Sequence, residues 1–215
     1  MSGNLLFHRH FTYFIFQKPC VKGGDEIMIN IENRRSLNID DFEFLCAFKK
    51  KGEPVYFRMI HDSIKSYSKK ENCLLEDNED EYGFIRHVFK RYQKKGCGIF
   101  FVVNDGGQCQ KNISWLTAQF GDADFGKKEI DKDEKGKPIF EYRTKEEIEV
   151  CKQEFLEKLL QFELEPSIIV ETKNGFHFYW LLKRNESQDL RMFKPIQKAI
   201  ISKFNSDTAM INLDR

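Results

Sequence analysis

Two aspartates separated by one residue are the clearest candidate for chemistry in this sequence. Asp122 and Asp124 flank Ala123 at the end of a segment that we expect to be a strand. Alternate residues of a strand project from one face, so both carboxylates would lie on the same side. Like charges this close repel each other unless a cation lies between them. Mg²⁺ and Mn²⁺ prefer such oxygen ligands, so the pair indicates a divalent-metal site, although Asp pairs also occur at strand ends without metal.

The second candidate is a turn at Asn174-Gly175, between two apolar runs. Asn-Gly in this setting is a strong signal for a β-hairpin. His177 and Tyr179 should point away from the core, whereas the alternating apolar residues form it: Phe176, Phe178, Trp180 and Leu182. Lys173 and backbone N–H groups around Gly175 would form a small anion-binding concavity. The turn therefore predicts a phosphate site, and the alternative is a purely structural His177.

The elements that must position these residues are readable from hydrophobic periodicity and turn signals. A capping box, Thr144 to Glu147, begins one helix, and Pro166 ends it. Pro195 either bends the last helix or restarts it. In chain order we expect strands at 14–16, 27–31 and 55–60, an acidic loop at 71–81, a helix at 80–96, a buried strand at 98–103, a strand at 116–124, a charged loop at 127–137, a helix from 144, a hairpin of strands 167–172 and 176–182, and a helix at 187–204. This order predicts an α+β fold with helices on one face of a largely antiparallel sheet.

The composition of the chain limits the classes of protein to which it can belong. The 215 residues carry a net charge of +1, so any phosphate-binding surface must be local. The six cysteines show no metal-ligand spacing, which favours reduced thiols over a disulfide framework or a zinc site. No apolar run approaches the length of a membrane span, and His8, Arg9 and His10 interrupt the first apolar stretch. We therefore expect a soluble, intracellular protein.

Taken together, the segments resemble the archaeo-eukaryotic primase (AEP) superfamily, in particular its plasmid- and phage-borne RepB-like primase-polymerases. That family has an hhhDhD/E strand, an s-x-H turn and a third acidic residue after a helix, where h is a hydrophobic residue, s a small one and x any residue. The corresponding segments here are 117–124, 166–180 and 195–207, and the approach at 100–107 is also similar. The resemblance covers roughly residues 54–215 and is specific over 98–215.

The resemblance implies a fold and an activity. The fold would be an RRM-like antiparallel sheet with helices packed on one face, forming a catalytic core at 54–215, with an accessory α/β portion at 1–53. The activity would be DNA-directed nucleotidyl transfer from dNTPs or NTPs on a single-stranded DNA template, in plasmid or phage replication. A helicase domain or protein is an expected partner. The resemblance also implies that the protein acts in the cytoplasm of a bacterial, archaeal or phage-infected host cell.

The resemblance also assigns the site residues. Two divalent ions, Mg²⁺ or Mn²⁺, would be held by three catalytic carboxylates: Asp122, Asp124 and Asp207. The incoming nucleotide would contact Lys173, Gly175, His177 and Arg215. Little covalent chemistry falls to the protein in such a reaction, because it positions the reactants and neutralises charge.

Two acids compete for the third ligand position, Asp207 and Asp214. In the family the third acid precedes an Arg by about eight residues, and Asp207 has that spacing to Arg215. If the last segment forms an edge strand, Asp207 and Asp214 face opposite sides, so only one can join the site. The resemblance therefore assigns Asp207.

Two departures from the family are visible. Gly175 replaces the small hydroxyl residue of the s-x-H turn, so only a backbone contact is expected there. In the family a basic run follows the position of Arg215, so we expect this core to be truncated at its C-terminal end.

Two other classes remain open from the residues. A rolling-circle replication endonuclease needs a His-hydrophobic-His pair, but the only H-x-H here is His8-Arg9-His10. A non-catalytic RRM-like nucleic-acid-binding module would expose aromatics on its sheet and require no metal. The carboxylates of Asp122 and Asp124 on that face disfavour the second class.

Overall fold

A computed structural model of the chain describes residues 12–15, 41–61, 63–64, 66–76, 79–183 and 189–215. The strand expected at 27–31 and the start of the last helix, 187–188, lie outside the described residues. The chain divides into two compact units, each built from two segments of the sequence: Met1–Asn38 with Gly121–Trp180, and Ile39–Phe120 with Leu181–Arg215.

A four-stranded antiparallel sheet forms the centre of the first unit. Its order is β1-β8-β9-β5, with the strands Thr12–Ile15, Ile168–Glu171, Gly175–Leu181 and Ala118–Asp124. The expected hairpin is therefore confirmed as β8 and β9, which pair in antiparallel register. β5 lies at one edge of this sheet, and the boundary between the two units falls within it, after Phe120.

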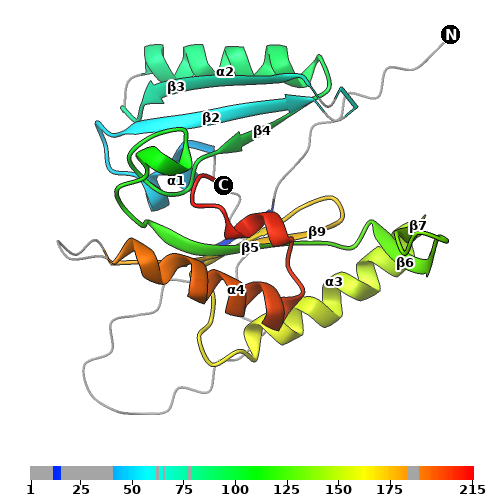
Figure 1. Cartoon of the computed structure of the whole chain (residues 1–215). Helices are drawn as coiled ribbons and strands as arrows, with labels where there is room; N and C mark the ends of the chain where they lie inside the picture. Colours follow the sequence, from blue (N-terminus) through cyan, green and yellow to red (C-terminus); the bar gives the residue numbers. More distant parts are fainter. Residues whose placement is uncertain (1–11, 16–40, 62, 65, 77–78, 184–188) are drawn as a thin grey trace, which may run out of the picture. The chain divides into compact units, whose positions relative to one another are not determined.

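Helix α3 (Lys145–Leu160) covers one face of this sheet (Figure 1). The ring of Phe155 packs on Phe176 and Phe178, at centroid distances of 6.2 and 5.6 Å. Both β9 residues are buried, as predicted. The prediction that Tyr179 points away from the core is wrong, because Tyr179 is only 6% exposed, and Trp180, predicted for the core, is half-buried. The capping box is also confirmed, because Glu147 N–H donates to Thr144 Oγ1 (3.2 Å) and Thr144 N–H donates to Glu147 Oε2 (2.8 Å).

The prediction of a loop at 127–137 is wrong. β6 (Lys127–Lys132) pairs with β7 (Pro138–Tyr142) in an antiparallel ribbon that follows β5 directly in the chain. All residues of the ribbon except Lys128 are exposed, so its sequence lacks the apolar alternation of a half-buried strand. Pro138 opens its strand, a position where proline is tolerated.

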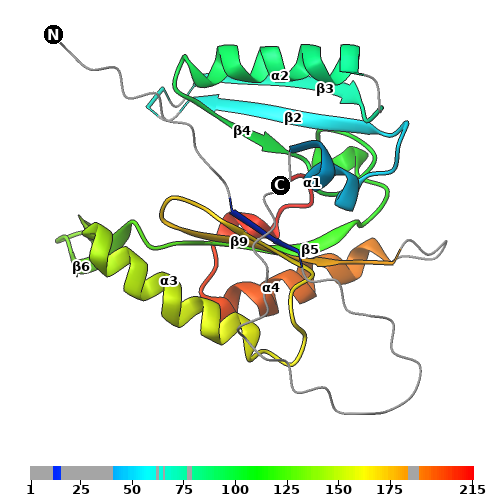
Figure 2. The same cartoon turned by 180° about the vertical axis from the view of Figure 1, so that it is seen from behind.

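A three-stranded antiparallel sheet, β3-β2-β4, forms part of the second unit. Its strands are Ser68–Leu74, Pro54–His61 and Cys97–Phe101, and its helices are α1 (Asp41–Phe48) and α2 (Glu79–Gln93). Figures 1 and 2 show α2 running along this sheet, where Phe89 packs on Phe57 at 4.6 Å. α1 packs through Phe44 and Phe48 on Phe101.

Two predictions for this sheet need correction. The acidic stretch expected as a loop from Glu71 begins inside β3, an exposed edge strand whose polar sequence shows no apolar alternation. The strand expected to be buried throughout 98–103 ends at Phe101, and Phe100 is 45% exposed because it lies on the face opposite Phe57 and Phe101.

The end of the chain is helical in short pieces. A 3₁₀ turn, η3 (Leu190–Met192), precedes α4 (Phe193–Phe204), so Pro195 lies in the first turn of α4, where its missing N–H removes no helical bond. The segment after α4 forms a 3₁₀ turn, η4 (Thr208–Ile211), and not an edge strand. The α+β class with antiparallel sheets is confirmed by these elements as a whole. None of the described helices is long and apolar enough to cross a membrane.

Candidate active site

The register of β5 against β9 places Asp122 opposite His177. Phe125 N–H donates to Asn174 O and Leu182 N–H donates to Thr117 O, both at 2.8 Å, and these two bonds define an antiparallel pairing. In that pairing Asp122 and His177 are direct cross-strand neighbours. Asp122 Oδ1 and His177 Nε2 are 3.6 Å apart.

Gly121 explains why the Asp122 side chain points away from the core. A Cβ at position 121 would lie 2.2 Å from Phe178 Cζ, so the strand backbone packs directly on the buried Phe178 ring. Because side chains alternate along a strand, Asp122 and Asp124 lie on the face opposite Phe178 and α3. Asp122 is half-buried and Asp124 is exposed. Both aspartates therefore present carboxylates on the same, solvent-accessible face, as the sequence predicts.

Asp124 also shapes the backbone that follows it. Its Oδ1 atom accepts a hydrogen bond from Gly126 N–H at 2.6 Å, which closes a short side-chain turn at the end of β5. The guanidinium of Arg143 donates to the carbonyl oxygens of Phe125 (3.0 Å) and Lys127 (2.8 Å). Sequence reasoning missed this role of Arg143, since an Arg in a charged segment gives no signal of backbone binding.

The hairpin turn is tightly constrained. A Cβ at Gly175 would lie 1.8 Å from the carbonyl oxygen of Ala123, so the turn accepts only glycine at this position. Gly175 N–H donates to Thr172 Oγ1 at 3.1 Å, so it is bonded within the turn and not open to an anion. Lys173 is exposed, and the side chain of His177 is 32% exposed. The groups that can reach a phosphate here are therefore the side chains of Lys173 and His177.

The three remaining candidates lie in the second unit. Asp207 is exposed and caps η4, because its Oδ1 accepts from Ala209 N–H at 2.9 Å. Asp214 forms an ion pair with Arg58, with Asp214 Oδ2 and Arg58 Nη2 2.6 Å apart. Arg215 is exposed, and its carbonyl oxygen accepts from Val103 N–H at 3.1 Å. Asp214 is thus engaged in a structural ion pair, whereas the Asp207 carboxylate lies at the surface.

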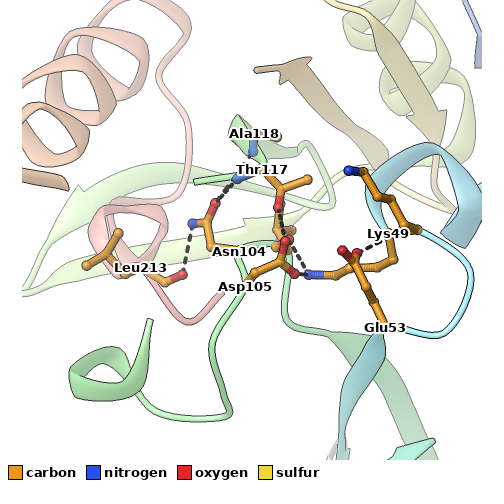
Figure 3. A network of polar contacts seen from close by, with 9 residues as sticks. Lys49, Glu53, Asn104, Asp105, Thr117, Ala118 and Leu213 are labelled. Carbon is orange, nitrogen blue, oxygen red and sulfur yellow. Dashed lines mark hydrogen bonds and ion pairs between the residues drawn. The ribbon is translucent and has the colours of Figure 1, made fainter. Parts of the chain in front are cut away.

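A buried polar network begins at Lys49, and sequence reasoning missed it (Figure 3). The Lys49 ammonium is fully buried, donates to Val103 O at 2.9 Å and pairs with the Asp105 carboxylate. The second oxygen of Asp105 accepts from Thr117 Oγ1 at 3.0 Å. A buried ammonium requires such partners, so Asp105 is a structural residue and more than part of a turn.

Asn104 continues this network toward the end of the chain. It is fully buried, its Oδ1 accepts from Thr117 N–H at 2.9 Å, and its Nδ2 donates to Leu213 O at 3.0 Å. One side chain therefore connects the approach to β5 with the C-terminal segment. The only sequence signal was a polar Asn-Asp pair directly after an apolar strand.

The donor set of the aspartate pair fits a hard divalent ion. In the described part of the chain, no three or more His, Cys, Asp or Glu side chains cluster so as to hold a metal ion. Mg²⁺, however, is usually bound through one or two carboxylates plus substrate phosphates. Asp122 and Asp124 supply two carboxylates on one accessible face, which is sufficient for such a site.

Comparison with known proteins agrees with this fold. No family model matches the sequence, nor does any curated protein. Among solved structures, the AEP domain of the primase-polymerase of cyanophage S-2L superposes with a TM-score of 0.51 and 19% sequence identity. The match covers 80% of this chain and 76% of that domain. The chain is similar in fold to a phage primase-polymerase domain. At this identity the likeness establishes the fold, and the activity must be argued from the site.

Proposed function

We propose that this chain is a DNA primase-polymerase domain that transfers nucleotides from dNTPs or NTPs to a strand growing on single-stranded DNA. The observation that carries the proposal is the accessible face of β5, where Asp122 and Asp124 lie on one side and His177 lies opposite Asp122. This arrangement occurs in a fold similar to that of a phage primase-polymerase domain.

The carboxylates are proposed to hold divalent ions. Asp122 and Asp124 would bind two Mg²⁺ or Mn²⁺ ions together with substrate phosphates, and the family resemblance adds Asp207 as the third ligand. Such ions would lower the pKa of the attacking 3′-hydroxyl and neutralise charge on the leaving pyrophosphate. The half-buried position of Asp122 strengthens its attraction for cations relative to a fully solvated carboxylate.

The nucleotide is proposed to lie beside the β8–β9 turn. Lys173 and His177 would donate to phosphate oxygens from the turn and from the accessible face of β9. Gly175 would contribute through the shape of the turn, because only a glycine fits against the Ala123 carbonyl and its N–H is bonded to Thr172 Oγ1. Arg215 would contribute a further phosphate contact, as the resemblance implies. These residues position and neutralise, which is the main contribution of proteins to phosphoryl transfer.

The finer assignments follow the resemblance. We infer a RepB-like primase-polymerase of a plasmid or phage, with an RRM-like catalytic core at 54–215, an accessory portion at 1–53 and a helicase domain or protein as partner. Such an enzyme acts in the cytoplasm of the host cell.

A nucleotide-incorporation assay tests the proposal. Labelled nucleotides, a single-stranded template with and without a primer, and Mg²⁺ or Mn²⁺ should yield extended products. Asp122→Asn should reduce incorporation roughly a hundred-fold or more, because it removes a charged ligand worth several kcal/mol in the transition state. The matched control is Asp131→Asn, at an exposed carboxylate of β6.

Both variants should melt at or near the wild-type temperature, since neither aspartate is in the core. Near-normal incorporation by Asp122→Asn would refute the proposal. A covalent tyrosine–DNA adduct without incorporation would also refute it and favour a rolling-circle endonuclease.

A further inference from the structure

The β6–β7 ribbon has two chemically different faces. Its register pairs Lys127 with Tyr142, Glu129 with Phe140 and Lys132 with Pro138, and an irregularity lies between Glu129 and Asp131. Directly paired residues share a face, so one face carries two lysines, one glutamate, a proline and two aromatic rings. We call it the aromatic face: Lys127, Glu129, Lys132, Pro138, Phe140 and Tyr142.

The opposite face is acidic and is turned toward α3. It carries Lys128, Asp131, Ile139 and Glu141. The ammonium of Lys128 lies 3.5 Å from Glu141 and 3.4 Å from Glu147 in the first turn of α3. The aromatic face therefore points away from α3, and Figure 1 shows the ribbon beside the start of that helix.

The two rings of the aromatic face are largely in solvent. Tyr142 is 75% exposed and Phe140 is 54% exposed, although rings of this size are normally packed. Lys127 Nζ lies 4.9 Å from the centroid of the Tyr142 ring, so a cation is held against one of the exposed π surfaces. Exposed apolar surface combined with local positive charge indicates a binding surface for a polyanion with flat apolar groups.

The base of the ribbon is fixed to the strand that carries the aspartate pair. Arg143 N–H donates to Gly126 O at 3.1 Å, and the Arg143 guanidinium bridges the carbonyls of Phe125 and Lys127. Gly126 N–H in turn donates to the Asp124 carboxylate. A ligand on the aromatic face would therefore be held in a defined position relative to Asp124.

We propose that the aromatic face of the β6–β7 ribbon binds single-stranded DNA. Bases stack on Phe140 and Tyr142, and backbone phosphates lie near Lys127 and Lys132. Stacking accepts any base because every base has a π face, and lysines attract phosphates without regard to sequence. The inference rests on the proposed function for the role of the bound DNA. That DNA would be the template or the primer beside Asp122 and Asp124.

The test measures DNA binding separately from catalysis. Fluorescence anisotropy of a labelled oligothymidylate is recorded with EDTA and without nucleotide, over a series of salt concentrations. Replacing both Phe140 and Tyr142 with Ala should raise Kd at least about tenfold, since base stacking on each ring contributes several-fold in affinity. Replacing Lys127 and Lys132 with Ala should lower the slope of log K against log salt by about 0.7 for each lysine.

Matched controls lie on the acidic face of the same ribbon. Ile139→Ala and Lys128→Ala remove an apolar side chain and a lysine, and both should bind the oligonucleotide as the wild type does. Wild-type affinity in the Phe140 and Tyr142 variant would overturn the inference, as would equal losses in the controls. Self-association or capture of a protein through this face, with DNA affinity unchanged, would overturn it too.

The outcomes separate this inference from the proposed function. Binding lost in the aromatic-face variants of a chain that never incorporates nucleotides would support the inference and refute the proposed function. Incorporation that persists with wild-type template affinity in those variants would support the proposed function and overturn the inference.

Discussion

At the scale of single residues, the Asp122–His177 pair is the centre of the candidate site. The 3.6 Å between Asp122 Oδ1 and His177 Nε2 exceeds a normal hydrogen bond, and about a third of each side chain reaches solvent. A phosphate and its counterion could therefore contact both groups from the same side. The proposed roles are separate: the Asp122 carboxylate would bind metal and the His177 imidazole would bind phosphate.

Replacing His177 with Ala tests that separation. Nucleotide affinity should fall roughly tenfold, the loss of one charge-assisted hydrogen bond, while Mn²⁺ affinity stays within about twofold. Nucleotide titration calorimetry and electron paramagnetic resonance of free Mn²⁺ measure the two quantities. His87→Ala, at an exposed histidine of α2, is the control. Collapse of Mn²⁺ affinity with nucleotide affinity intact would reverse the assignment of His177.

Substitutions of Asp207 and Asp214 are expected to differ in their effects on stability and on nucleotide incorporation. Asp214→Ala leaves half-buried Arg58 without its carboxylate partner, so it should cost about 1–2 kcal/mol of unfolding free energy in urea titration. Asp207→Ala should cost less than about 1 kcal/mol, the value of one cap at a short 3₁₀ turn, yet abolish incorporation. Full activity of Asp207→Ala together with inactivity of a folded Asp214→Ala would exchange the two roles.

At the scale of elements, α3 and the β6–β7 ribbon are joined through one carboxylate. Glu147 accepts from Thr144 N–H at the start of α3 and from Lys128 of the ribbon. The pKa of Glu147 is lowered, first by the hydrogen bond from the Thr144 backbone and then by that from Lys128. The pKa of Lys128 is raised by the same contact with Glu147. Ionisation of Glu147 therefore stabilises the folded state.

Glu147→Gln should show this linkage as a pH dependence. Because the folded pKa of Glu147 lies below its unfolded value, its stabilisation is present above the unfolded pKa and is lost as pH falls through the folded pKa. The variant should melt below the wild type at neutral pH, and the two should converge in acid. Glu154→Gln, at an exposed carboxylate later in α3, should show a smaller difference at neutral pH. A constant difference between Glu147→Gln and the wild type at all pH values would contradict the linkage.

At the scale of the whole molecule, β5 carries the aspartate pair at its C-terminal end. Thr117, the residue that precedes β5, is held by a buried polar network. Asn104, Asp105 and Lys49 bond to Thr117 or to one another, and Asn104 also holds Leu213 near the C-terminus (Figure 3). Segments far apart in the sequence are thereby fixed together within the second unit. Such a network is stable only while all of its buried members are paired.

Asn104→Ala should therefore be strongly destabilising. It leaves the buried Thr117 N–H and the partly buried Leu213 O without this partner, which should cost about 2–4 kcal/mol in urea unfolding. Asn72→Ala, on the exposed edge strand β3, should change stability by less than about 0.5 kcal/mol. An equal effect of the two substitutions would show that the Asn104 network contributes little.

The sequence alone determined the elements whose signals are local. The Thr144–Glu147 capping box and the Asn174-Gly175 turn predicted one helix and one hairpin, and both are present. Strand alternation alone placed Asp122 and Asp124 on one face and put Phe176 and Phe178 in the core. These predictions succeed because side-chain periodicity and turn chemistry depend on residues within a few positions of each other.

Only the tertiary structure decided the features that depend on distant partners. β3 and the β6–β7 ribbon are exposed, so their strands are held by backbone pairing that leaves no apolar pattern in the sequence. The approach of Asp122 to His177 follows from the register of β5 on β9, and the pairing of Arg58 with Asp214 joins residues 156 positions apart. Each depends on which segments meet in the folded chain, because pairing and burial are set by packing between segments and not by local sequence.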